Sequence, residues 1–150
     1  MTPRFWKLSH GAEAFSFEEF LLLMDRHVAC MHKDTRAKGT TTTSQGEEFI
    51  NAEVGDYVYL THGNQGVYLL GQFVGPVNIF SSRGKGWVER DYRVIRHSKI
   101  REPYTGAHKW WTPMDRSTFV QVPVAEHQMF EQLILRPYFH IDLSQYGIGA

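Results

Sequence analysis

The sequence has little cysteine, no net charge and no long apolar run. Its single cysteine, Cys30, excludes an internal disulfide framework and suggests a reducing compartment. No apolar run approaches the roughly 18 residues that a transmembrane helix needs. The first residues, MTPRFWKLSHG, lack the apolar core of a signal peptide. We therefore expect a cytoplasmic protein that has no membrane partner. The 150 residues suit a single domain over 1–150 because no linker divides them.

The sequence also lacks the common catalytic signatures. It has no P-loop motif, no GxSxG nucleophile elbow and no convincing acid/base pair of carboxylates. The contiguous His32-Lys33-Asp34 does not match the phospholipase-type nuclease motif, in which one residue separates the His from the Lys. His32 and Asp34 are candidate metal ligands, but no other His or Cys stands at a convincing ligand spacing. We accordingly expect no enzyme activity, no cofactor and no metal.

Charge is distributed unevenly along this neutral chain. Residues 81–101 hold seven basic residues against two acidic ones, a net charge of +5, so the rest of the chain carries −5. Trp87 and Tyr92 lie within the same segment. Cations beside aromatic rings suit phosphate contacts next to a stacking surface, as in proteins that bind nucleic acid. The residues expected to hold phosphates are Arg83, Lys85, Arg90, Arg93 and Arg96; Lys99 and Arg101 complete the basic set.

Hydrophobic periodicity predicts a mixed fold, and aromatic residues, 14% of the chain, supply much of its apolar content. Gly71, inside one strand pattern, suggests a bulge or a close backbone approach. Arg136-Pro137 is expected to end the last helix. The expected strands are 5–9, 28–31, 57–60, 67–74, 87–95 and 117–122, and the expected helices are 15–24, 47–51 and 125–136. This order predicts an α+β class, a small curved sheet or β-barrel flanked by two to three helices, with the barrel core ending at 122 and a tail after the last helix.

Three segments, in their order and spacing, resemble a known family. They are Phe5-Trp6-Lys7-Leu8-Ser9-His10-Gly11, Gly55-Asp56-Tyr57-Val58-Tyr59-Leu60 and Leu69-Leu70-Gly71-Gln72-Phe73-Val74-Gly75. Together they resemble the EVE branch of the PUA-like superfamily, and most of all the N-terminal modules of McrB-type, modification-dependent restriction GTPases. YTH domains are more distant relatives. The resemblance covers residues 5–95.

The resemblance implies a small β-barrel that flips one modified base into a pocket with aromatic walls. By position, Ser9 and His10 end the first strand, where the family lines its pocket. His32 falls where related domains place a cage aromatic, commonly Trp, and is a departure from that pattern. The remaining expected pocket residues are His62 and Asn64 with Thr61 at the rim, Phe80 or Trp87 as a second wall and, outside the resemblance, Trp111.

We therefore expect a non-catalytic module that recognises a modified, methylated base. The expected target is DNA, in a restriction or defence system, with a fused or associated GTPase or nuclease as a partner. One alternative is a PUA-like RNA-binding module that acts on tRNA or rRNA. A second is a small metal-dependent hydrolase that uses His32, Asp34 and His62. A structural interaction domain with an aromatic core is the third.

Overall fold

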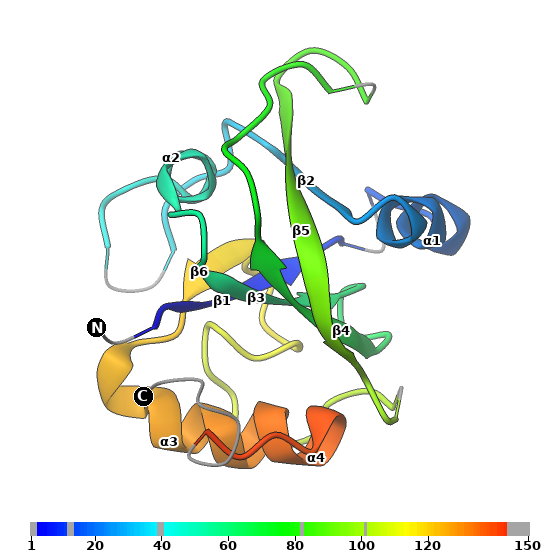
Figure 1. Cartoon of the computed structure of the whole chain (residues 1–150). Helices are drawn as coiled ribbons and strands as arrows, with labels where there is room; N and C mark the ends of the chain where they lie inside the picture. Colours follow the sequence, from blue (N-terminus) through cyan, green and yellow to red (C-terminus); the bar gives the residue numbers. More distant parts are fainter. Residues whose placement is uncertain (1–2, 12–13, 39–40, 82, 101, 144–150) are drawn as a thin grey trace.

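A strongly curled six-stranded sheet forms a half-barrel at the centre of the protein (Figure 1). The computed structural model describes residues 3–11, 14–38, 41–81, 83–100 and 102–143. The order of strands across the sheet is β2-β5-β4-β3-β1-β6, and only β1 and β3 pair in parallel. The strands are β1 (Phe5–Ser9), β2 (Val28–His32), β3 (Tyr57–Thr61), β4 (Val67–Phe73), β5 (Trp87–His97) and β6 (Phe119–Gln121).

Both faces of the sheet are covered, so its central strands are buried along their length. Successive side chains of a strand point to opposite faces. Phe5 therefore packs in a cluster with the C-terminal helical segment, whereas Trp6 packs in a second cluster with helices α1 and α2. Lys7 follows the same alternation and shares its face with Phe5. This placement buries the ammonium group of Lys7 inside the fold.

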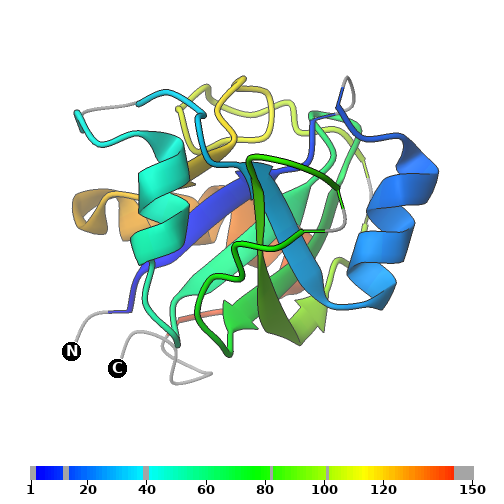
Figure 2. The same ribbon diagram turned by 90° about the horizontal axis from the view of Figure 1, so that it is seen from above.

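Helices flank the half-barrel on three sides. Figure 2 shows α1 (Phe17–Asp25) and α2 (Gln45–Asn51) at opposite edges of the half-barrel. Ser16 precedes α1 and forms a capping box with Glu19. The Ser16 hydroxyl accepts from the Glu19 N–H, and the Glu19 carboxylate accepts from the Ser16 N–H. The C-terminal segment runs beneath the sheet as a 3-10 turn (Val124–Glu126), α3 (His127–Phe130), a π-helical turn (Glu131–Leu135) and α4 (Arg136–Phe139).

The coarse fold expectation is confirmed: the protein is α+β, with a curled sheet and flanking helices. The expected strands and helices all occur, with bounds that shift by a few residues. Gly71 lies where the β4–β5 register shifts, and a Cβ there would stand 2.8 Å from Tyr92 Cδ1. The expected end of the last helix at Arg136-Pro137 is wrong. Proline is tolerated in a first helical turn, so the chain stays helical to Phe139, and left-handed His140 (φ 56°) ends it. Most of the expected tail, 144–150, lies outside the described residues.

Candidate functional site

The pocket that gathers the most predicted site residues has a volume of about 550 Å³. That volume is in the range of small-molecule binding sites. The pocket lies where the parallel strands β1 and β3 end, at the end of β2 and at the start of β5, and the loop 113–118 forms its remaining side. Its lining residues are Ser9, Gly11, Ala14, Phe15, Cys30, Met31, His32, Thr35, Gly63, Asn64, Trp87 and residues 113–118.

Three aromatic rings meet on one side of this pocket. Trp87 and His32 are cross-strand partners on β5 and β2, and their rings lie edge to face with centroids 5.4 Å apart. The Phe15 ring stands at 89° to the Trp87 ring, at 5.5 Å. Gly86 allows this approach, because its φ is +85° and a Cβ there would lie 2.5 Å from His32 Nε2. The arrangement leaves Trp87 half-buried in the pocket wall.

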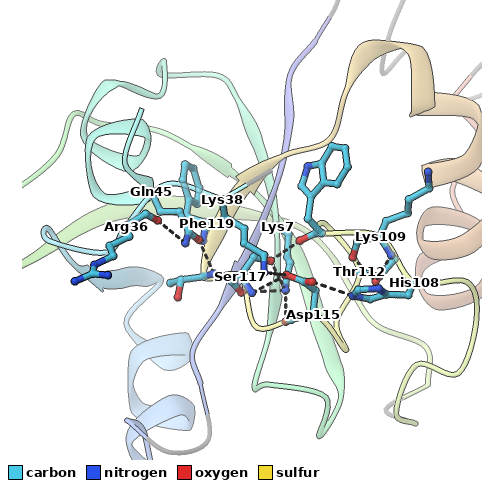
Figure 3. Close-up of polar contacts among 12 residues, drawn as sticks. Lys7, Arg36, Lys38, Gln45, His108, Lys109, Thr112, Asp115, Ser117 and Phe119 are labelled. Atoms are coloured by element: carbon cyan, nitrogen blue, oxygen red, sulfur yellow. Dashed lines mark hydrogen bonds and ion pairs between the residues drawn. The ribbon is translucent and has the colours of Figure 1, made fainter. Parts of the chain in front are cut away.

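Another part of the pocket lining is the loop 113–118, which a buried lysine holds in place (Figure 3). Lys7 Nζ donates to Asp115 O at 2.8 Å, to Ser117 O at 3.0 Å and to Ser117 Oγ at 2.8 Å. Burial lowers the pKa of Lys7 to about 7, against the opposing effect of the Asp115 charge. Gln45 Oε1, from α2, accepts from Thr118 N at 2.6 Å and from Phe119 N at 2.8 Å. The loop is therefore pinned at several backbone atoms.

The carboxylate of this loop, Asp115, is neutralised by its neighbours. Its Oδ1 lies 2.9 Å from His108 Nε2, and Lys38 Nζ lies 3.7 Å from its Oδ2. Ser117 N donates to Oδ2 at 2.8 Å. Burial opposes ionisation of Asp115, but these hydrogen bonds outweigh it and hold its pKa below the ordinary value. The pocket wall thus carries a paired carboxylate rather than a free negative charge.

Four of the predicted base-pocket residues line this pocket: Ser9, His32, Asn64 and Trp87. Ser9 Oγ accepts from Gly63 N at 3.2 Å, so its own hydrogen is available to a ligand. The Asn64 amide is engaged on both sides, since Nδ2 donates to Tyr104 O and Oδ1 accepts from Tyr104 N. Asn64 therefore shapes the pocket edge.

His10 and His62 lie behind the pocket lining and are buried. His10 Nε2 accepts from Cys30 N at 3.3 Å, which joins the chain after β1 to β2 across the curled sheet. Burial first, and then the nearby His62 and Arg83, lower the pKa of His10 to about 3, so the imidazole is neutral. His62 Nε2 lies 2.7 Å from Phe15 O. Both imidazoles hold the wall of the pocket in place.

Phe80 and Trp111 do not line the pocket. Trp111 is 0% exposed, packs against Phe130, and donates from Nε1 to Glu126 Oε1 at 3.0 Å. It is a core residue and lies in a turn. Phe80 is 80% exposed in the loop between β4 and β5.

The basic residues of the 81–101 segment are mostly committed to the fold or distant from the pocket. Arg90 is 2% exposed and donates to Phe49 O at 3.0 Å, to Ala52 O and to Gly75 O. Arg83 pairs with Glu19 at 2.7 Å, and its guanidinium carbon lies 3.8 Å from the Phe15 ring centroid. Arg101 lies outside the described residues.

Arg93 and Arg96 lie six and nine residues beyond Trp87 on β5, which at about 3.3 Å per residue is roughly 20 and 30 Å along the strand. Arg93 Nε donates to Gln72 Oε1 at 2.7 Å, and Arg96 Nη1 donates to Phe139 O at 3.1 Å. Lys85 is exposed in the loop just before Trp87. Among the described residues, the Lys85 side chain makes no hydrogen bond or ion pair. Of the expected phosphate-binding residues, Lys85 is therefore the one that lies next to the pocket and is not bound to the rest of the protein.

Sequence reasoning missed the loop side of the pocket. Met114, Arg116 and Thr118 line it, although they lie about a hundred residues from Ser9 in the chain. The segment 102–118 has no periodicity, so no pattern in the sequence brings it to this place. Phe15 was assigned to a helix pattern, but it precedes α1 and lines the pocket.

A second hollow, of about 600 Å³, lies on the other side of Trp87 and shares Cys30 with the pocket. Two carboxylates, Glu19 and Glu89, line it. Glu19 pairs with Arg83, and Glu89 accepts from Ser81 Oγ at 2.9 Å. Arg26 and Arg83 line the hollow as well, so its two carboxylates face two arginines and it carries no excess of either charge.

Neither a metal-binding cluster nor a membrane-spanning helix occurs in the described part of the chain. No three His, Cys, Asp or Glu side chains there converge on a point that suits a metal ion. Of the expected hydrolase set, His32 Nδ1 and Asp34 Oδ2 lie 3.8 Å apart, but buried His62 does not form a cluster with them. Nor does that part of the chain hold a helix of the length and apolarity that a bilayer crossing requires.

The fold and site together define a half-barrel protein with an aromatic-walled pocket at one end of its sheet. Comparison with family models gives no match, and comparison with curated proteins finds no relative.

Proposed function

We propose that this protein is a non-catalytic nucleic-acid-binding module that takes a methylated base, flipped out of DNA, into the pocket beside Trp87. The observation that supports it most is the pocket wall, in which a half-exposed indole and the rings of Phe15 and His32 adjoin apolar Met31. A flipped base offers a π face for stacking, and its methyl group adds apolar contact. The resemblance of residues 5–95 to EVE domains implies the same function.

The proposed roles follow from the chemistry of each side chain. Trp87 stacks on the base, and His32 closes the adjacent side. The Ser9 hydroxyl donates to an acceptor on the base edge, because its oxygen already accepts from Gly63 N. Met31 and Met114 contact the methyl group, since thioether side chains adapt to irregular apolar shapes. Lys85 contacts a phosphate near the mouth of the pocket.

In the cell, we propose that the module serves a restriction or defence system in the cytoplasm, together with a GTPase or nuclease that is fused to it or associated with it. The module selects the modified site, and its partner supplies the chemistry. This division of labour requires only binding from the present chain.

An equilibrium binding series tests the proposal with oligonucleotides that differ in one methyl group. Fluorescence anisotropy should give tighter binding to methylated DNA than to unmodified DNA. Stacking on an aromatic side chain contributes about 1–3 kcal/mol per base, so Trp87→Ala should weaken binding to the methylated strand by roughly 5- to 150-fold. Phe80→Ala is the matched control, because that ring is exposed and outside the pocket, and it should bind as the unsubstituted protein does.

The alternative outcomes are distinct. Equal affinity for methylated and unmodified strands, or no binding at low salt, would refute a modified-base reader. Tighter binding to methylated RNA than to DNA of the same sequence would replace DNA with RNA as the target and favour the PUA-like RNA-binding alternative. Affinity should fall only modestly with salt, with a slope that corresponds to about three to five phosphate contacts.

A further inference from the structure

One arginine at the pocket has a charge that the fold does not use. Arg116 is exposed and lines the pocket from the loop 113–118. Within the described residues its side chain makes no hydrogen bond or ion pair. Arg83 and Arg90, by contrast, are bound to a carboxylate or to backbone carbonyls. Arg116 is therefore a guanidinium that is free to bind a ligand.

The residues on both sides of Arg116 are held rigidly. Lys7 Nζ donates to Asp115 O and Ser117 O, the backbone carbonyls of the two residues next to Arg116 in the chain. The Ser117 hydroxyl also donates to Trp110 O. Because the buried Lys7 ammonium donates three hydrogen bonds to this one loop, it fixes the backbone from which Arg116 extends. Binding then costs less conformational entropy than it does for a side chain on a loose loop.

The electrostatics of the loop leave a positive charge at this rim. Asp115 is the carboxylate next to Arg116, but it is paired with His108 and Lys38 and its side chain is 7% exposed. Asp115 is the only carboxylate among the described residues that line the pocket. Within that lining, an anion that reaches Arg116 thus meets a guanidinium and no unpaired carboxylate. Guanidinium groups bind phosphate in a bidentate manner and remain charged at every physiological pH.

We infer that Arg116 binds the phosphate of the nucleotide whose base occupies the pocket, so that different parts of the lining hold the base and the phosphate. The inference rests on the proposed function, since it assumes a base beside Trp87. The aromatic side of the pocket takes the base, and the loop side takes the phosphate. Specificity then resides in the aromatic side, whereas Arg116 sets the orientation of the strand and adds affinity irrespective of methylation.

The test compares a methylated nucleoside with its 5′-monophosphate as ligands for the same protein. In titration calorimetry, the monophosphate should bind the unsubstituted protein about 10- to 150-fold more tightly, because hydrogen bonds to charged groups contribute about 1.5–3 kcal/mol. Arg116→Gln should remove this advantage and leave nucleoside affinity within about twofold. With methylated oligonucleotides, the same variant should reduce the salt slope by about one. Arg116 is exposed, so the variant is expected to fold.

The control variant is Arg93→Gln, which removes an exposed arginine roughly 20 Å along β5 from Trp87. It should bind nucleoside and monophosphate as the unsubstituted protein does. Equal affinity of the unsubstituted protein for both ligands would overturn the role of Arg116, even where methylated DNA is still preferred. Inorganic phosphate that competes as strongly as the monophosphate would also overturn it, because the site would then recognise phosphate without a base. Loss of methylation preference in oligonucleotides would instead refute the proposed function itself.

Discussion

Protonation of His10 should destabilise the protein by an amount that follows from the structure. The neutral Nε2 accepts the Cys30 N–H, so a proton on that nitrogen breaks the hydrogen bond between β2 and His10, the residue that follows β1. The pKa of His10 in the folded state is about 3, below the ordinary value of 6.5. The unfolded chain therefore binds the proton more tightly. Stability is fully present above about pH 6.5 and declines as the pH falls toward 3.

A pH of 5 lies about 1.5 units below the ordinary histidine pKa of 6.5. At about 1.36 kcal/mol per unit, the free energy of unfolding at pH 5 is lower by roughly 2 kcal/mol. For a chain of this length, that loss corresponds to a fall in Tm of about 4–8 °C. His10→Gln keeps an acceptor near Nε2 but does not titrate, so its stability should change by about 2 kcal/mol less between about pH 7 and pH 5. The assay is urea unfolding of both proteins at the two pH values.

His97→Gln provides the control, because His97 is exposed at the end of β5. This variant should keep the pH dependence of the unsubstituted protein. The other titrating groups, including the half-buried imidazole of His127, are common to all three proteins and cancel in the comparison. Identical pH dependence in His10→Gln and the unsubstituted protein would refute the reasoning.

Two further predictions concern the scaffold of the site. Arg90→Lys should lower the free energy of unfolding by about 2–5 kcal/mol in urea titrations, because the donors of an ammonium leave from one nitrogen and cannot reach the carbonyls that the separate nitrogens of the guanidinium bind. Arg93→Lys, on an exposed arginine, should stay within about 0.5 kcal/mol, and similar losses in both would contradict a structural role for Arg90. Gly46→Ala should lower Tm, since its Cβ would stand 1.8 Å from the backbone oxygen of Lys33. Gly75→Ala is the control, because its Cβ meets nothing within 4 Å, and it should leave Tm unchanged or raise it. An unchanged Tm in Gly46→Ala would contradict the prediction and show that the backbone at Lys33 moves away from residue 46.

The strands were predictable because their patterns are local. The buried run at 57–60 and the alternation at 87–95 are typical of strands, and both occur as β3 and β5. The Ser16 and Glu19 pair likewise signals the start of α1. The one wrong helix boundary, at Pro137, reflects an exception to a local rule, since proline at the start of a helical turn does not stop it.

The candidate site was only partly predictable because it depends on which distant segments meet. Ser9, His32 and Trp87 end or begin strands, and the curl of the sheet brings them together. The prediction that Trp111 lines the pocket was wrong, because its ring is buried by the C-terminal helix that covers it. Charge was the least reliable guide. The +5 segment suggested a phosphate-binding face, yet Arg90 is buried under α2 and serves the fold.

The indole NMR signals of the four tryptophans test the central claim most directly. Trp6 Nε1–H is bound to Asp56 Oδ2 at 3.0 Å, and Trp111 Nε1–H is bound to Glu126, so both report on the fold. Trp87 stands in the pocket wall. In a titration with a methylated oligonucleotide, the Trp87 indole signal should shift or broaden strongly while those of Trp6 and Trp111 stay in place, and the unmodified strand should give a weaker response. A Trp87 signal that does not change at saturation, or that responds equally to both strands, would contradict the account.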